Sequence, residues 1–93
     1  MVTCGVAIIG AGIGGLVAAV QLAARGVPVT VFERAATPGG KLREIEADGV
    51  RIDSGPTVFT LRDVFDAVFA DAGARLSDHL TLRPLDVLAR HAW

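Results

Sequence analysis

The sequence predicts an α/β fold in which a parallel strand–helix–strand unit is followed by a β-hairpin and an amphipathic helix. Two apolar runs flank a glycine-rich turn and a helical stripe, and the dipeptide Asp48-Gly49 separates two further runs. Apolar residues also recur at helical spacing from Leu61 to Ala72. We expect the strand–helix–strand core at 4–34 and interpret 1–93 as the N-terminal part of one incomplete domain.

The strand–helix–strand unit begins with an apolar run at 5–9, whose length and composition suit a strand covered on both faces. After the glycines of 10–15 the pattern becomes helical, with a stripe formed by Ile13, Leu16, Val17, Val20 and Ala24. Gly26 is placed to end this helix, and a second apolar strand follows at 29–32. We therefore expect a buried strand, a turn and a buried helix.

The alternative for this region is a membrane helix, because residues 1–24 contain no charged side chain. A spanning helix needs about 20 predominantly apolar residues, so the length is nearly sufficient. However, four glycines fall within 10–15, and each costs about 1 kcal/mol in a helix interior. A secretory signal would also need a positively charged start, which 1–4 lacks. The sequence therefore favours the strand–turn–helix interpretation.

A loop at 35–40 and a β-hairpin are predicted next. Pro38-Gly39-Gly40 is typical of a loop, and Asp48-Gly49 indicates a tight two-residue turn. The hairpin strands are expected at 41–47 and 50–53, and the alternation of side chains along the first predicts a half-buried pair.

The second helix is expected to open at Thr60, because Thr60 and Asp63 have the spacing of an acidic capping box. Its apolar stripe consists of Leu61, Val64, Phe65, Val68, Phe69 and Ala72, and we interpret the phenylalanines as core residues. Gly73 is placed to end the helix. The segment 80–93 is expected to be extended, with Leu85, Val87 and Ala89 on one side.

The composition excludes several classes of protein. The net charge is −1, with 9 basic and 10 acidic residues, so nothing indicates a nucleic-acid-binding surface. The only cysteine, Cys4, excludes an internal disulfide and fits a cytoplasmic location. One cysteine and two separated histidines form no metal-ligand pattern. A hydrophobic content of 52% and a mean hydropathy of +0.51 exceed what a small domain needs, so we expect apolar faces that a larger protein would cover.

The glycine turn carries the strongest functional signal, a G-x-G-x-x-G pattern at Gly10, Gly12 and Gly15. Gly10 allows a tight turn, Gly12 lets a pyrophosphate approach the backbone, and Gly15 lets the helix lie close to the strand. The start of the helix, at Ile13 and Gly14, then directs its N–H groups toward the phosphates. The alternative is a turn that only connects strand to helix.

An acid at the end of the second strand completes this pattern. Glu33 lies 23 residues after Gly10, close to the roughly 20-residue spacing of a ribose-binding acid. Its carboxylate can accept hydrogen bonds from both ribose hydroxyls of an adenosine, whereas it would repel a 2′-phosphate, which argues against NADP. The unit is therefore interpreted as a Rossmann-like site for the ADP part of a dinucleotide.

The stretch Glu33-Arg34-Ala35-Ala36-Thr37-Pro38-Gly39-Gly40-Lys41 resembles the extended signature of the flavin amine oxidase and phytoene desaturase superfamily. The resemblance implies FAD as the cofactor. Arg34 and Lys41 would flank the adenosine and pyrophosphate, with Gly39 and Gly40 in a loop over the cofactor. Ordinary surface charge is the alternative for the two basic residues. Asp53-Ser54-Gly55-Pro56-Thr57 resembles the segment that runs near the flavin ring, with Gly55, Pro56 and Thr57 as site residues; a plain turn is the alternative.

The segments 49–60 and 82–93 are similar to bacterial carotenoid desaturases, and the second resembles the hydroxycarotenoid (methoxyneurosporene) 3,4-desaturase branch. The resemblance implies a flavin-dependent removal of two hydrogens from a long apolar polyene, and peripheral association with the inner membrane. Family members are several times longer. It therefore implies that the remainder of the protein supplies the substrate domain and the rest of the flavin pocket, and that these 93 residues alone are inactive.

No catalytic residue can be assigned from the sequence. His79 and His91 are the acid–base candidates by residue type, but no partner acid or nucleophile is spaced to orient either one. Three alternative functions stay open at this point: another enzyme of the superfamily, such as an amine oxidase or a carotenoid isomerase, a nicotinamide-dependent dehydrogenase, and a non-catalytic nucleotide-binding fragment.

Overall fold

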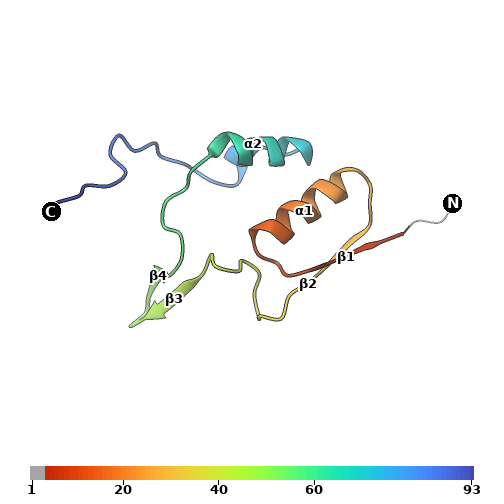
Figure 1. The fold of residues 1–93 in the computed structure, drawn as a ribbon, viewed down its shortest axis with the longest axis horizontal. Helices are drawn as coiled ribbons and strands as arrows, with labels where there is room; N and C mark the ends of the chain where they lie inside the picture. The colour runs from red at the N-terminus through yellow and green to blue at the C-terminus, as the bar shows by residue number, and fades with distance from the viewer. Residues whose placement is uncertain (1–3) are drawn as a thin grey trace.

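The computed structural model describes residues 4–93, so residues 1–3 of the expected domain lie outside the described residues. The elements in chain order are β1 (Val6–Ile9), α1 (Ile13–Ala24), β2 (Val29–Phe32), β3 (Glu44–Ala47), β4 (Val50–Asp53), α2 (Arg62–Asp71) and the short 3₁₀ turn η1 (Leu76–Asp78). Figure 1 shows α1 beside the β1–β2 pair and α2 alongside α1. The β3–β4 hairpin lies apart from the two helices. The predicted α/β order is confirmed.

The first unit is a parallel pair of strands joined by a helix. β1 pairs with β2 in a register that runs from Val6 opposite Val29 to Ile9 opposite Phe32. Because parallel strands need a crossover, α1 returns the chain to the start of the second strand and contacts both strands. The predicted helix at the glycine turn forms as a 12-residue helix. Among residues 4–93, no helix has the length and apolar character needed to cross a membrane.

Both helices end at the predicted glycines. Gly26 and Gly73 adopt left-handed backbone angles, with φ of 78° and 73°. After α1, the N–H groups of Gly26 and Val27 donate to the carbonyls of Ala23 and Leu22, at 2.9 and 3.1 Å. This pairing is the Schellman motif, in which a residue with positive φ closes the last turn and satisfies its carbonyl groups.

The hairpin forms around the predicted turn. Asp48 and Gly49 both have positive φ, 50° and 78°, as a type I′ turn requires. Two expectations for the hairpin are wrong. β3 begins at Glu44 rather than at residue 41, because the chain still turns there: the Leu42 N–H donates to the Gly39 carbonyl at 3.0 Å. The pair is also exposed along both strands rather than half buried.

The start of α2 differs from the prediction. The N-cap is Leu61, which has left-handed angles, and no side chain caps the helix, so the Thr60 capping box does not form. The helix instead begins at Arg62, whose guanidinium pairs with Asp66 one turn later at 3.4 Å. The apolar stripe is only half covered, since Phe65, Val68 and Phe69 are half-buried and Val64 is exposed. The expected extended strand at 80–93 is also absent from the described residues, which form no regular element after η1.

The chain buries very little of its apolar surface. Among residues 4–93 the buried apolar residues are Ala11 and Leu76. Ile9 and Phe32, paired at the ends of the two parallel strands, are 83% and 54% exposed. The expectation that the first strand and helix are buried is therefore wrong for this chain by itself, because the described residues provide no second layer over these faces.

Candidate dinucleotide-binding site

Two glycines of the turn are required by the backbone of the chain itself. Gly10 has a φ of 101°, and its N–H donates to the carbonyl of Phe32 at 2.7 Å, which joins the turn to the end of β2. A Cβ atom on Gly15 would overlap the carbonyl oxygen of Gly10 and would lie 3.3 Å from Cγ2 of Ile8. Only a residue without a side chain lets α1 approach β1 this closely.

Gly12 is different, because no contact among residues 4–93 requires a glycine there. It is the N-cap of α1, with extended angles of −78° and −176° that any residue adopts. A Cβ atom would meet only Gly40 Cα, at 3.9 Å, which is an ordinary contact. At Gly14 an added Cβ would have no neighbour within 4 Å. The space at these two glycines is therefore available to a ligand.

The N-terminus of α1 is open to an anion. No side chain in the described part of the chain caps the helix, and the first turn contains no acidic residue. The N–H groups of the first turn of a helix have no partner inside the helix, and the helix dipole places partial positive charge there. Ile13, the first helical residue, is 50% exposed. A phosphate group is a chemically suitable partner for this end of the helix.

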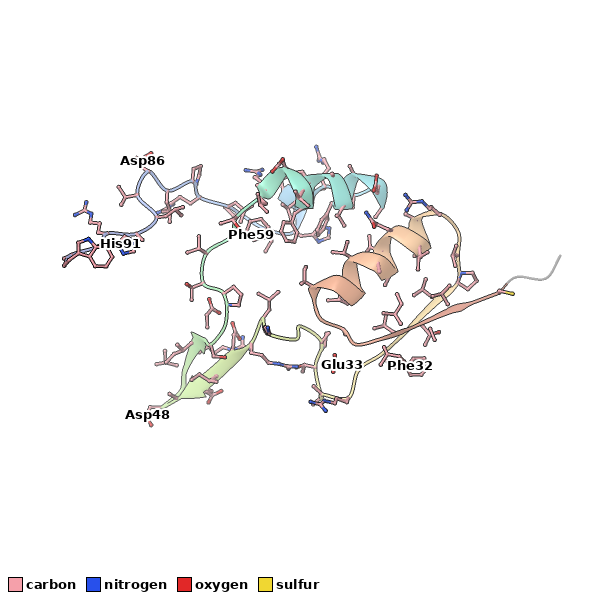
Figure 2. All side chains as sticks on the ribbon, in the orientation of Figure 1. Phe32, Glu33, Asp48, Phe59, Asp86 and His91 are labelled. Carbon is pink, nitrogen blue, oxygen red and sulfur yellow. The ribbon has the colours of Figure 1, made fainter. Side chains whose placement is uncertain are left out.

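Glu33 connects the glycine turn to the loop after β2. Figure 2 shows the residue just beyond the end of β2. Its Oε2 accepts a hydrogen bond from the Ala11 N–H at 2.8 Å, and its Oε1 accepts one from the Ala35 N–H at 3.0 Å. These backbone donors, with Ala35 first and Ala11 next, lower the pKa of the Glu33 carboxyl, and the charge of Arg43 adds to the effect. The carboxylate therefore stays ionised at neutral pH.

Replacing Glu33 with glutamine should lower the thermal stability of the protein, by an amount that depends on pH. An amide has one acceptor oxygen, so it cannot satisfy the N–H groups of both Ala11 and Ala35. Because the folded-state pKa of Glu33 is lowered, the stability that its carboxylate contributes is complete above the unfolded-state pKa and is lost as the pH falls through the lower folded-state pKa. We expect the melting temperature of Glu33→Gln to be below that of the unchanged protein at pH 7, with the difference shrinking at acid pH. Thermal scans across this range check it, and a constant difference would contradict it.

The loop between β2 and β3 lies directly over the glycine turn. The Gly39 N–H donates to the Ala11 carbonyl at 2.8 Å. A Cβ atom on Gly40, where φ is 60°, would come within 3.0 Å of Gly12 Cα. Gly39 itself has a φ of 128°. The two glycines that were predicted to fold over a cofactor are thus brought against the residue that was predicted to receive the pyrophosphate.

Two cavities adjoin the loop and the glycine turn. One, of about 400 Å³, is lined by Ala11, Leu16, Val31, Glu33, Ala35, Ala36, Thr37 and Pro38. The other, of about 620 Å³, is lined by Gly12, Ile13, Gly39, Gly40, Lys41, Leu42, Pro56, Val58, Phe59, Thr60 and Phe65. The first contains the acid and the second contains the open helix N-terminus. Arg34 and Lys41 are both exposed, and Lys41 alone lines one of these cavities.

The segment after β4 joins the site in part. A Cβ atom on Gly55 would overlap the carbonyl oxygen of Lys41, so this glycine allows a close approach to the loop. Pro56 lines the larger cavity beside the glycine turn. Thr57 instead lines a separate cavity of about 350 Å³, together with Arg62 and Leu82. The structure therefore brings Gly55 and Pro56 to the candidate site, whereas Thr57 lines a separate cavity.

Sequence reasoning missed two groups of contacts. The N–H groups of Ala11 and Ala35 hold Glu33, and the Arg43 side chain bonds to Thr37 and Gly40. The backbone donors follow from the turn geometry, which residue types do not reveal. The sequence did not identify Arg43 as a site residue, because the residue falls within the strand predicted at 41–47.

The histidines lie outside the candidate site. The ring of His79 packs on Phe69 with centroids 5.3 Å apart, and that of His91 stacks on Trp93 at 5.8 Å. Figure 2 shows His91 near the C-terminus, far along the molecule from Glu33. Within residues 4–93, no cluster of side chains could hold a metal ion.

A glycine turn between a parallel strand and a helix N-terminus, with an ionised acid at the end of the neighbouring strand, defines a nucleotide-binding segment of the Rossmann type. A family profile described as the NAD(P)-binding Rossmann-like domain matches residues 8–74. The chain belongs to this family, and the fold prediction is confirmed.

The chain is also similar to carotenoid desaturases. The hydroxyneurosporene desaturase of Rubrivivax gelatinosus is 60% identical over 88 residues, which cover 95% of this chain and 17% of that protein. The hydroxyneurosporene desaturase of Rhodobacter capsulatus is 54% identical over 88 residues, 95% of this chain and 18% of that protein. A phytoene dehydrogenase of Streptomyces griseus is 47% identical over 77 residues, 83% of this chain and 15% of that protein. The predicted resemblance is confirmed, and the chain spans less than a fifth of these relatives.

Proposed function

We propose that this chain is the N-terminal, ADP-binding segment of a FAD-dependent carotenoid desaturase that acts on a hydroxycarotenoid. The observation that carries the proposal is the 60% identity to a hydroxyneurosporene desaturase across 95% of the chain. The open glycine turn supports it, because Gly12 leaves room for a ligand that residues 4–93 do not fill. The proposal assigns the substrate tunnel and the rest of the flavin pocket to other parts of a longer protein.

The residues of the chain fit the ADP half of FAD. In the proposed site, the first turn of α1 and Gly12 would bind the pyrophosphate, and the ionised Glu33 would accept hydrogen bonds from the ribose hydroxyls. Gly39 and Gly40 would cover the pyrophosphate, the exposed Arg34 and Lys41 would lie at its flanks, and Gly55 and Pro56 would extend the site toward the ring. A bound flavin supplies the two-electron acceptor for removing two hydrogens from adjacent carbons. The chain itself binds and orients the dinucleotide.

The choice of FAD over a nicotinamide cofactor rests on the residues after Glu33. The chain turns into a loop and a hairpin rather than into another helix, and the loop returns over the glycine turn. An ionised carboxylate at the ribose would also repel a 2′-phosphate, which argues against NADP. A competition titration in which FAD, NAD and NADP displace one another tests this choice, and we expect FAD to displace both of the others.

The activity is tested in a single turnover by the full-length protein. The purified protein, loaded with FAD, is mixed without oxygen with vesicles that contain hydroxyneurosporene. We expect loss of the oxidised flavin absorption together with a shift of the carotenoid absorption to longer wavelength, because desaturation lengthens the conjugated system. Bound FAD with an unchanged carotenoid would instead favour another enzyme of the superfamily. The 93-residue chain alone is expected to be inactive, since the proposal assigns the substrate tunnel and the rest of the flavin pocket to other parts of the protein.

We also propose that the full-length protein associates peripherally with the inner membrane from the cytoplasmic side. The support is chemical, because a polyene substrate resides in the apolar part of a bilayer. Flotation of the protein with liposomes on a density gradient checks the association, and recovery only in the lipid-free fraction would contradict it.

A further inference from the structure

The Arg43 side chain binds the loop that lies over the glycine turn. Arg43 donates through Nε to the Gly40 carbonyl at 2.9 Å, and through Nη1 and Nη2 to Oγ1 and the carbonyl oxygen of Thr37, at 2.8 and 3.3 Å. A guanidinium is a planar fork of donors, so these bonds fix both ends of the 37–40 segment at once. Gly39 and Gly40 lie within that segment, against Ala11 and Gly12.

The backbone of Arg43 is fixed at the same time. Its carbonyl accepts hydrogen bonds from the Ser54 N–H at 2.8 Å and from Ser54 Oγ at 3.1 Å. Ser54 immediately precedes Gly55, which approaches the carbonyl of Lys41 so closely that no side chain fits. One residue therefore connects the loop over the glycine turn to the segment that follows β4.

We propose that Arg43 is a positioning residue of the nucleotide site, which orders the 37–43 loop over Gly12 and so prepares it for the dinucleotide. This inference rests on the proposed function. Arg43 acts through the loop rather than on the ligand, because its donors are directed to Thr37 and Gly40. Its charge also contributes to the lowered pKa of Glu33 on the other side of the loop. A loop ordered in advance loses less conformational entropy when the nucleotide binds.

The test compares Arg43→Ala with a matched control in the full-length protein. Arg51 is also an arginine of the hairpin region, but its partner is Glu44, at 3.2 Å, and both side chains are exposed. We expect Arg43→Ala to raise the dissociation constants for FAD and for ADP by roughly tenfold, equivalent to about 1.4 kcal/mol. Arg51→Ala should leave both within about twofold, because exposed ion pairs contribute little. Titrations followed by calorimetry measure these constants.

Two further variants separate positioning from charge and from general stability. Arg43→Lys keeps the charge but cannot reproduce the fork, so it should rescue binding only in part. Thr37→Val removes the Oγ1 acceptor and should weaken binding less than Arg43→Ala. The double variant should be no weaker than Arg43→Ala alone, because both changes break the same contact. Thr37→Val also keeps the test decisive if Arg43→Ala fails to fold.

The outcomes separate this inference from the proposed function. Three results would each overturn the positioning role. They are unchanged nucleotide affinity in a folded Arg43→Ala variant, full rescue of binding by Arg43→Lys, and additive effects of the Thr37 and Arg43 substitutions. If the unchanged protein binds ADP but not FAD, the proposed function fails, and the ADP titrations still decide the role of Arg43. If the unchanged protein binds neither nucleotide, the proposed function and the positioning role of Arg43 are both wrong.

Discussion

Replacing Gly12 with valine should abolish dinucleotide binding while the protein remains folded. The backbone at this position is extended and accepts any residue, and an added Cβ meets Gly40 Cα at an ordinary 3.9 Å. The branched side chain would therefore occupy the space over the helix N-terminus where the pyrophosphate must approach. We expect the dissociation constant for FAD to rise at least a hundredfold, equivalent to about 2.7 kcal/mol, as measured by calorimetry on the full-length protein.

Two companion variants make the Gly12 result specific. Gly12→Ala adds only the Cβ atom, which the chain accommodates, so weaker binding by this variant would come from the ligand side of the contact. Gly5→Ala is the control, because a Cβ there would meet Pro28 at no less than 3.6 Å, away from the turn. It should bind FAD as the unchanged protein does. Unchanged affinity in Gly12→Val would show that the cofactor does not lie over this glycine.

Replacing Gly15 with alanine should instead destabilise the fold. The new Cβ would overlap the Gly10 carbonyl oxygen and would also contact Cγ2 of Ile8 at 3.3 Å, so α1 must move away from β1. Overpacking of this kind typically costs about 1–3 kcal/mol, and a rigid backbone oxygen makes the upper part of this range the expectation. Thermal or denaturant unfolding of the full-length protein without cofactor measures the loss. Nucleotide binding should weaken as a consequence.

The neighbouring glycine provides the control for Gly15. A Cβ on Gly14 has no atom within 4 Å, and φ there is not positive. Gly14→Ala lies in the same helix and should gain helical stability, by about 1 kcal/mol at most. Equal stability of Gly15→Ala and the unchanged protein would mean that the close approach of α1 to β1 is not required for the fold.

The regular elements could be predicted from the sequence because local patterns determine them. The second strand occurs at the predicted residues, and Gly26, Gly73 and Asp48-Gly49 adopt the backbone angles for which they were identified. The capping prediction at Thr60 failed because the chain enters α2 through Leu61 in a left-handed conformation. Such an entry depends on the preceding segment, and residue spacing does not encode it. Burial was overestimated because the patterns indicate which faces are apolar but not whether the described residues cover them.

Some residues of the candidate site could likewise be predicted from local sequence patterns, and others could not. Gly10, Gly15 and Glu33 were identifiable because each meets a local requirement of the turn or the strand end. The position of Gly39 and Gly40 near the glycine turn was expected only from the family resemblance, because it depends on a loop path that no local pattern encodes. The role of Arg43 could not be predicted for the same reason, because the path of the loop, and not a sequence motif, brings its partners Thr37 and Gly40 to it.

The identity of the nucleotide that the full-length protein binds decides whether this chain forms part of a FAD site. The purified protein is denatured, and the released nucleotide is separated by chromatography and identified by its absorption spectrum and mass. We expect FAD, bound one per chain and lost from the Gly12→Val variant. Release of NAD or NADP from a protein that FAD cannot reload, or an unaltered FAD content in the Gly12→Val variant, would contradict it.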